Sequence, residues 1–322
     1  MYSRIAGTGG YLPEKVLTNA DLEKIVDTTD EWIRSRTGIH SRHIAAPEET
    51  TSSMSTIAAR RAMEMAGVGP DEVDFVIVGT TTPDVVFPNV ATIVQAALGI
   101  HDTPALSVET ACSGFMYALS IADKYVRLGE AKCALVIGAE CLTRIVDWKD
   151  RTTCVLFADG AGAVILKPSA EPGILTTIVS ADGRYRDLLS YPYGVSSGFD
   201  KLRSGAPAAL TMKGNEVFKV AVNKLSKLVD QTLAKAGVDK SEIDWLVPHQ
   251  ANLRIIQAAA RKLDMPMERV VVTVTHHGNT SAASVPLALD AAVRDGRIQR
   301  GQMLLLEAFG GGFTWGSALL RF

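Results

Sequence analysis

The sequence repeats itself at long range, and this repeat limits the folds that the chain can adopt. Residues 65–78 match residues 235–248 at an offset of 170, and residues 128–136 match residues 300–306 at an offset of 172. Each match contains the end of a helix, a glycine turn, a polar spacer and then an apolar strand. A repeat of this length exceeds a solenoid unit, so it predicts a duplicated domain.

The apolar segments between the glycine turns predict the fold class. Residues 74–79 (DFVIVG) form a continuous apolar run, which is typical of a strand buried on both faces. Further predicted strands are residues 3–12, 105–108 and 133–138, and predicted helices are residues 19–25, 27–37, 52–66, 89–98 and 112–127. This alternation predicts an α/β protein. With 322 residues, 47% of them hydrophobic, the chain can fill two cores, which we assign to residues 1–172 and 173–322.

Cys112 stands between a predicted strand and the start of a long helix. The helix dipole and its free N–H groups favour negative charge at that end. A thiol so placed is expected to have a lowered pKa and to be nucleophilic. Burial of an inert thiol is the competing interpretation, because free cysteines are often buried.

The repeat predicts which polar residues accompany Cys112. His249 corresponds to Gly79 at the offset of 170 and follows an apolar strand, and Asn279 corresponds to Cys112 at an offset of 167. If a pseudo-twofold axis relates the halves, the ends of equivalent strands converge, so Cys112, His249 and Asn279 should line one cleft. Taken singly, His249 also fits a buried core histidine and Asn279 a turn residue.

Other motifs exclude several functions. The loop at residues 310–312 (GGG) has no following Lys-Ser/Thr and is not a phosphate-binding P-loop, but it suits either a tight hairpin or an N–H group that faces an oxyanion. Residues 159–163 (DGAGA) precede no convincing helix, which argues against a dinucleotide site. No histidine, cysteine or carboxylate pair has metal-ligand spacing, so we expect no metal site.

Charge and hydropathy indicate a cytoplasmic protein. The formal net charge of −2 gives no sign of binding to nucleic acid or to an anionic membrane. No apolar run reaches the roughly 18 residues of a spanning helix, and the first residues lack the apolar core of a signal peptide. The four cysteines, Cys112, Cys133, Cys141 and Cys154, show no paired spacing and are expected to be reduced.

Four motifs together resemble one family across nearly the whole chain. Residues 110–115 (TACSGF), 248–252 (PHQAN), 277–281 (HGNTS) and 310–316 (GGGFTWG) resemble β-ketoacyl-acyl carrier protein synthase III. The resemblance implies a thiolase fold, with a duplicated five-layered α-β-α-β-α architecture and mixed sheets, in a homodimer. It implies an acyltransferase that starts fatty-acid synthesis from a short acyl-CoA such as acetyl-CoA and malonyl-acyl carrier protein, without a permanently bound cofactor.

The resemblance also implies a mechanism. Cys112 attacks the thioester of the acyl-CoA, and coenzyme A leaves an acyl-enzyme behind. Malonyl-acyl carrier protein then loses CO₂, and His249 and Asn279 stabilise its enolate, which attacks the acyl group. The N–H groups of Cys112 and Gly311 form the oxyanion hole.

Binding residues follow from the same resemblance. For coenzyme A they are Trp32, Arg36, Thr37, Arg151, Gly214, Asn215 and Phe218. For the acyl pocket they are Thr81, Phe87, Leu142, Phe157 and Leu189, with Phe87 entering the partner subunit's pocket. For the carrier protein they are Lys219 and Arg254, although such charges also fit an ordinary surface. The chain departs from the family pattern at Thr152, where glycine is common, and at residues 195–207, where it is longer.

Three other functions are compatible with parts of the sequence. A related condensing enzyme of secondary metabolism would share the Cys-His-Asn residues and take an aromatic or longer acyl-CoA. A cysteine hydrolase would need a path for water and a basic histidine beside Cys112. A non-catalytic protein that binds coenzyme A is disfavoured by the three intact residues.

Overall fold

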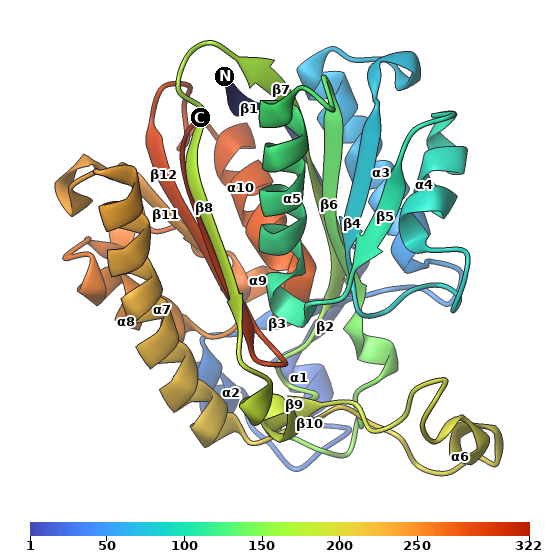
Figure 1. Cartoon of the computed structure of the whole chain (residues 1–322). Coiled ribbons are helices and arrows are strands. Elements are labelled where there is room, and N and C mark those ends of the chain that lie inside the picture. Colours follow the sequence, from blue (N-terminus) through green and yellow to red (C-terminus); the bar gives the residue numbers. More distant parts are fainter.

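The computed structural model describes residues 1–322, which form five alternating layers of helices and sheets (Figure 1). From one side to the other, the helical layers are α7 (Gly214–Ala236) with α8 (Leu253–Lys262), then α5 (Gly114–Leu128) with α10 (Ser284–Arg294), then α3 (Thr51–Ala66) with α4 (Val90–Leu98). A sheet separates each pair of layers. The predicted α-β-α-β-α architecture is therefore confirmed.

The two sheets are mixed, as predicted. The first has the order β1-β7-β6-β4-β5, and the second has the order β11-β12-β13-β8. The strands of the first sheet are β1 (Tyr2–Tyr11), β7 (Asp159–Ser169), β6 (Ala134–Cys141), β4 (Phe75–Gly79) and β5 (Ala105–Val108). Those of the second are β11 (Trp245–Pro248), β12 (Met303–Gly310), β13 (Thr314–Arg321) and β8 (Ile174–Ala181). Each sheet contains a parallel pair at an equivalent position, β4 with β6 in the first sheet and β11 with β12 in the second.

The halves share one topology. In the second sheet, Val270 forms a parallel bridge with Leu246 of β11. Val270 thus occupies the edge that corresponds to the position of β5 beside β4 in the first sheet. Strand β7 ends in the first sheet at residue 169 and strand β8 begins in the second at residue 174. The division between residues 172 and 173 falls between these strands and stays a prediction.

The offset of 167 that paired Cys112 with Asn279 is wrong. Helices α5 and α10 begin at Gly114 and Ser284, and each follows a 3₁₀ turn, η2 (Ala111–Ser113) or η7 (Ser281–Ala283). Cys112 therefore corresponds to Ala282 at the offset of 170 that holds elsewhere. Asn279 reaches the site because it lies in the turn before η7.

The central helices α5 and α10 pack between the two sheets. The core around them is made of buried apolar side chains from both helices and both sheets. At Gly138 of β6 an added Cβ would lie 2.2 Å from the carbonyl oxygen of Ala282. Only glycine allows this approach, which brings the η7 turn against β6.

The local boundaries differ from the predictions near the N-terminus. Helix α1 is short (Asn19–Leu22), and Thr18, rather than Asn19, caps it by accepting the Asp21 N–H. Helix α2 (Asp30–Thr37) begins later than predicted, because Thr29 caps it. These helices connect β2 (Lys15–Thr18) with β3 (Ser41–Ile44), which form an antiparallel pair.

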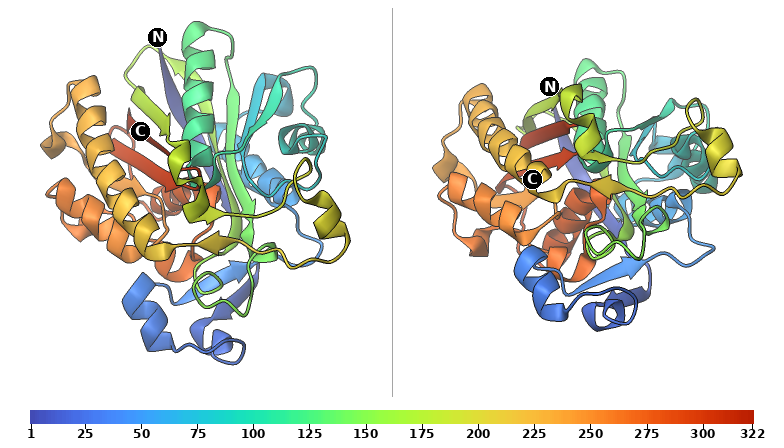
Figure 2. Two further views of the ribbon diagram at one scale, coloured as in Figure 1. Left: turned by 60° about the horizontal axis from the view of Figure 1, so that its bottom comes forward. Right: turned by 90° about the horizontal axis from the view of Figure 1, so that it is seen from below.

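The remaining elements lie near one end of the layers. They are α6 (Phe199–Arg203), α9 (Val274–His277), β9 (Leu189–Ser190) and β10 (Thr211–Met212). The segment that carries α6 extends away from the body of the protein (Figure 2). None of the helices combines the length and apolar composition that a membrane-spanning helix requires.

Candidate active site

Cys112 lies at the N-terminal end of the central helix α5, as predicted. It follows Ala111, whose φ of 46° turns the chain sharply between β5 and the helix. The thiol is buried, with 6% of the residue exposed. It lines two cavities, one of about 430 Å³ and one of about 550 Å³, which we call the first and the second cavity. A nucleophile at this junction can be reached from both cavities.

The predicted lowering of the Cys112 pKa is wrong for the free protein. Burial raises the pKa of this thiol to about 11, because a thiolate loses its solvation there. The Ser281 hydroxyl, 3.3 Å from Sγ, lowers the pKa but does not outweigh burial. Its position at a helix N-terminus was therefore not enough to predict the pKa of Cys112. The thiol needs a proton acceptor before it can attack a substrate.

His249 follows β11 and is held by Ser284. Its Nδ1 lies 2.5 Å from the Ser284 hydroxyl, which also accepts the N–H of Gln250. No other acceptor is near this hydroxyl, so we assign its proton to Nδ1 and the ring proton to Nε2. Burial lowers the pKa of His249 to about 3, so the imidazole is neutral at physiological pH and can donate from Nε2.

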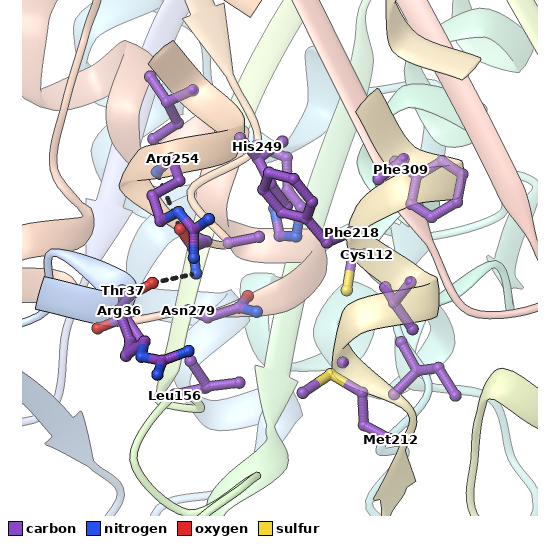
Figure 3. Close-up of a pocket in the computed structure, with 18 of the residues that line it drawn as sticks. Arg36, Thr37, Cys112, Leu156, Met212, Phe218, His249, Arg254, Asn279 and Phe309 are labelled. Atoms are coloured by element: carbon purple, nitrogen blue, oxygen red, sulfur yellow. Dashed lines mark hydrogen bonds between the residues drawn. The ribbon is translucent and has the colours of Figure 1, made fainter. Parts of the chain in front are cut away.

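Asn279 is fixed by its backbone and by its own amide oxygen. Its N–H donates to the carbonyl of Leu156, and its Oδ1 accepts the Ser281 N–H at 3.0 Å. The NH₂ group is left as a donor. The side chains of Cys112, His249 and Asn279 all line the first cavity, as predicted, and Figure 3 shows Asn279 pointing toward the sulfur atom.

The glycine-rich loop forms the turn between β12 and β13. Gly310 packs so closely on η2 that an added Cβ would lie 2.6 Å from the Cys112 nitrogen. The N–H groups of Cys112 and Gly311 donate to no group within the chain. The loop is thus a tight hairpin that also leaves two free amides close to the thiol, and their oxyanion role stays a prediction.

All seven residues predicted to bind coenzyme A line the first cavity. They are Trp32, Arg36, Thr37, Arg151, Gly214, Asn215 and Phe218. The Arg151 guanidinium lies 5.2 Å from the centre of the Trp32 ring, so Arg151 must move before a base can enter between them. Arg254 also lines this cavity and lies over Phe218, whereas Lys219 lies on the outer face of α7.

Four of the five predicted acyl-pocket residues line the second cavity. They are Thr81, Leu142, Phe157 and Leu189. Phe87 lines neither cavity of its own chain and is 83% exposed. Tyr191 and Tyr193, just before the long segment at residues 195–207, also line the second cavity.

Four polar residues beside the site were not predicted from the sequence. Ser281 and Ser284 hold Asn279 and His249, and Glu140 lies next to Ser281. Glu307 lines the first cavity with both carboxyl oxygens unpartnered, and burial raises its pKa to about 8. An acidic residue inside an apolar strand was the available signal for both glutamates. No cluster of three or more potential metal ligands is formed.

Solved structures share this fold over the entire chain. A 3-oxoacyl-[acyl-carrier-protein] synthase III from Aquifex aeolicus VF5 superposes with a TM-score of 0.93 at 48% identity, covering 99% of this chain and 100% of that one. The priming β-ketosynthase of the R1128 polyketide pathway gives 0.94 at 39% identity, with 99% and 96% covered. Fold and site therefore define a thiolase-fold condensing enzyme.

Sequence comparisons narrow this class to one family. Residues 106–183 and 233–322 match the family models for 3-oxoacyl-[acyl-carrier-protein (ACP)] synthase III and its C-terminal part. A β-ketoacyl-[acyl-carrier-protein] synthase III of Xanthomonas axonopodis pv. citri is 65% identical over 322 residues, covering 100% of this chain and 99% of that protein. One of Thioalkalivibrio sulfidiphilus is 64% identical over 321 residues, with the same coverage. The chain belongs to the 3-oxoacyl-[acyl-carrier-protein] synthase III family.

Proposed function

We propose that the protein condenses an acyl-CoA with malonyl-acyl carrier protein, releasing CO₂ and coenzyme A, to start fatty-acid synthesis. The observation that carries the proposal is the position of Cys112 where two cavities meet, with His249 and Asn279 on the walls of one of them. The secondary-metabolism alternative is not favoured, because relatives at 64–65% identity are β-ketoacyl-[acyl-carrier-protein] synthases III.

In the first half-reaction, the Cys112 sulfur attacks the thioester carbonyl. The N–H groups of Cys112 and Gly311 receive the negative charge of the tetrahedral intermediate. Free amides suit this task because they are fixed before the reaction and need no reorganisation. The C–S bond to coenzyme A then breaks, and the acyl group remains on Cys112.

In the second half-reaction, the malonyl thioester loses CO₂ and becomes an enolate. The neutral His249 donates from Nε2 and Asn279 from its NH₂ group to the enolate oxygen. Ser284 and the Ser281 N–H keep these two donors oriented. Because the negative charge develops only during the reaction, the donors stabilise the transition state more than the bound substrate. They therefore lower the free-energy barrier.

The coenzyme A part of the substrate and its acyl group occupy different cavities. Coenzyme A occupies the first cavity, with its adenine base between Trp32 and Arg151 and its pantetheine chain in the tunnel beside Arg36. The acyl group occupies the second cavity between Leu142 and Phe157. The resemblance favours a short acyl group such as acetyl, because a large ring at the position of Phe87 is typical of members that use short acyl groups.

We further propose a cytoplasmic homodimer. Phe87 is 83% exposed and Val86 is 64% exposed, so an apolar segment projects from the chain. A second copy that receives Phe87 would cover this segment and complete its acyl pocket. Lys219 and Arg254 would contact the acidic carrier protein near the mouth of the first cavity.

The test is intact-mass measurement after mixing the protein with acetyl-CoA. The expected result is one acetyl group on Cys112, discharged to 3-oxoacyl product only when malonyl-acyl carrier protein is added. The variant Cys112→Ala should take up no acetyl group, while Cys154→Ala, which changes a buried thiol outside both cavities, should react normally. Absence of an adduct with any acyl-CoA would contradict the proposal, and hydrolysis without malonyl-dependent product would indicate a cysteine hydrolase.

A further inference from the structure

Two polar groups outside the Cys-His-Asn trio form a hydrogen-bonded chain with the thiol of Cys112. The Ser281 hydroxyl oxygen lies 3.3 Å from the Cys112 sulfur and 3.4 Å from Oε1 of Glu140. Ser281 begins the η7 turn, and Glu140 is the second-last residue of β6. The close contact of Gly138 with Ala282 keeps these two elements together. A single hydroxyl thus connects the nucleophile with a carboxyl group.

Glu140 is a buried carboxyl group without a cationic partner. It is fully inaccessible, and its partners are all hydroxyl or amide donors: the Thr82 hydroxyl at 2.6 Å, the N–H and the hydroxyl of Thr81 at 3.1 Å, and the hydroxyls of Thr80 and Ser281. These donors stabilise its ionised form, whereas burial favours the protonated form and raises the pKa to about 7. Both protonation states are therefore accessible near neutral pH.

The hydrogen-bond roles follow from the chemistry of the three groups. An ionised carboxyl group only accepts, so the Ser281 O–H donates to Glu140 and the Ser281 oxygen is free to accept the S–H of Cys112. When Glu140 is protonated and Cys112 is a thiolate, the Glu140 O–H donates to Ser281 and the Ser281 O–H donates to the sulfur. Both hydrogen bonds have then reversed their direction. The geometry is the same in both states, so protons can move without rearrangement of the residues.

We infer that Ser281 and Glu140 take up the proton of Cys112 when the thiol attacks the acyl-CoA. The S–H bond breaks and its proton passes to the Ser281 oxygen, while the Ser281 proton passes to Glu140. The sulfur electron pair forms the bond to the thioester carbon, and coenzyme A leaves as a thiolate that is protonated by water. This inference rests on the proposed function, because it concerns the acylation step of that reaction.

The same hydrogen-bonded groups also return Cys112 to its thiol form at the end of the catalytic cycle. Glu140 keeps its proton while the acyl group occupies Cys112, because the acylated sulfur cannot accept it. Condensation expels Cys112 as a thiolate. Glu140 then returns its proton through Ser281, which regenerates the thiol and the carboxylate. One proton thus moves from Cys112 to Glu140 and back in each turnover.

The other titratable groups of the site are less suited to this task. His249 is neutral and directs Nδ1 to Ser284, and neither it nor Glu307 forms a hydrogen bond with the sulfur. Around Glu140, the titratable groups that couple with it are the thiols of Cys112 and Cys141.

Two acidic groups on neighbouring segments are occupied elsewhere. Asp84 accepts hydrogen bonds from Ser52, and Asp159 accepts them from Thr143 and the Ala45 N–H. Ionisation of Glu140 should therefore dominate the pH dependence of acylation near neutrality.

The test is the single-turnover rate of Cys112 acetylation by acetyl-CoA between about pH 5.5 and 9.5, measured by intact mass. The wild-type rate should rise with pH and level off above about pH 7, as Glu140 ionises. Glu140→Gln keeps the shape of the side chain but replaces one carboxyl oxygen by an NH₂ donor and removes the proton acceptor, so it should lower the rate about 100-fold at pH 7.5 and abolish the inflection. Ser281→Ala should have the same effect with the carboxyl group intact, and Glu140→Asp should regain the inflection.

The matched control is Asp159→Asn, which makes the same change at another buried carboxyl group and should leave the profile within about threefold of the wild type. A wild-type profile without an inflection near pH 7, or an inflection that Glu140→Gln and Ser281→Ala both retain, would overturn the inference. If wild-type protein takes up no acetyl group at all, the proposed function fails instead. Iodoacetamide alkylation of Cys112 then still reports whether the inflection depends on Glu140.

Discussion

Replacement of His249 by alanine should separate the two half-reactions of the proposed cycle. With a pKa of about 3, fewer than about one imidazole in 1,000 is charged at pH 6, so His249 acts as a neutral donor across the working range. Loss of one preorganised donor at a developing oxyanion typically lowers a rate by about 10²–10³, equivalent to roughly 2.7–4 kcal/mol. Asn279 remains in place, so condensation should fall by that amount and not disappear.

Acetylation of Cys112 should be nearly unaffected in the same variant. The assay first forms the acetyl-enzyme with acetyl-CoA and follows it by intact mass, and then measures CO₂ release and 3-oxoacyl product after malonyl-acyl carrier protein is added. His276→Ala is the matched control, because His276 is an exposed histidine outside both cavities and should change neither rate by more than about twofold. If acetylation fell as far as condensation, His249 would be acting as the base for Cys112, and the reasoning from its neutral state would be refuted.

Three other changes test different parts of the structure. Glu307→Gln removes a carboxyl group whose pKa is raised by burial from 4.5 to about 8. The unfolded chain ionises this group first, so wild-type stability should decrease as the pH rises from about 4.5 to 8, and the variant should melt several degrees higher than the wild type at pH 8.5 but not at pH 4.5. Equal melting temperatures at both pH values would contradict the assignment. Gly138→Ala places a Cβ 2.2 Å from the Ala282 oxygen and should destabilise the protein by at least about 1–3 kcal/mol in a denaturant titration, whereas Gly69→Ala, with open space around it, should have little effect. An unchanged midpoint for Gly138→Ala would show that the contact can relax. Arg151→Ala should raise the KM for acetyl-CoA about tenfold with little change in kcat, since it removes a cation near the Trp32 ring at the mouth of the first cavity, while Arg186→Ala serves as the exposed control. A fall in kcat alone would argue against a binding role.

The sequence contains enough information to predict the architecture and the three central residues. The repeat at an offset of 170 is a property of the chain itself, and apolar runs of strand length need no tertiary information to be recognised. Cys112 follows β5 and His249 follows β11, so the converging strand ends bring these two residues together, whereas Asn279 enters the same cavity from the turn before η7. Pairing Cys112 with Asn279 was wrong because residues 278–280 correspond to residues 108–110 at the offset of 170.

Protonation states could not be predicted from the same patterns. The Cys112 pKa depends on how many atoms surround the sulfur, and burial there outweighs the helix terminus that the sequence reveals. The partners Ser281 and Glu140 lie 141 residues apart and meet only through packing of η7 on β6. Their contact depends on a glycine whose importance becomes visible only when the two elements are seen together.

The two 3₁₀ turns at the centre of the molecule begin with residues of the same unusual conformation. Ala111 has a φ of 46° and Ser281 a φ of 51°, at equivalent positions of the two halves. After a duplication, each copy of such a turn can mutate without altering the other, provided that its backbone is kept. One copy presents a thiol and the other a hydroxyl to the same point in space. An asymmetric site can therefore arise on a symmetric scaffold through single-residue changes, which a dimer of identical chains could not make on one side alone.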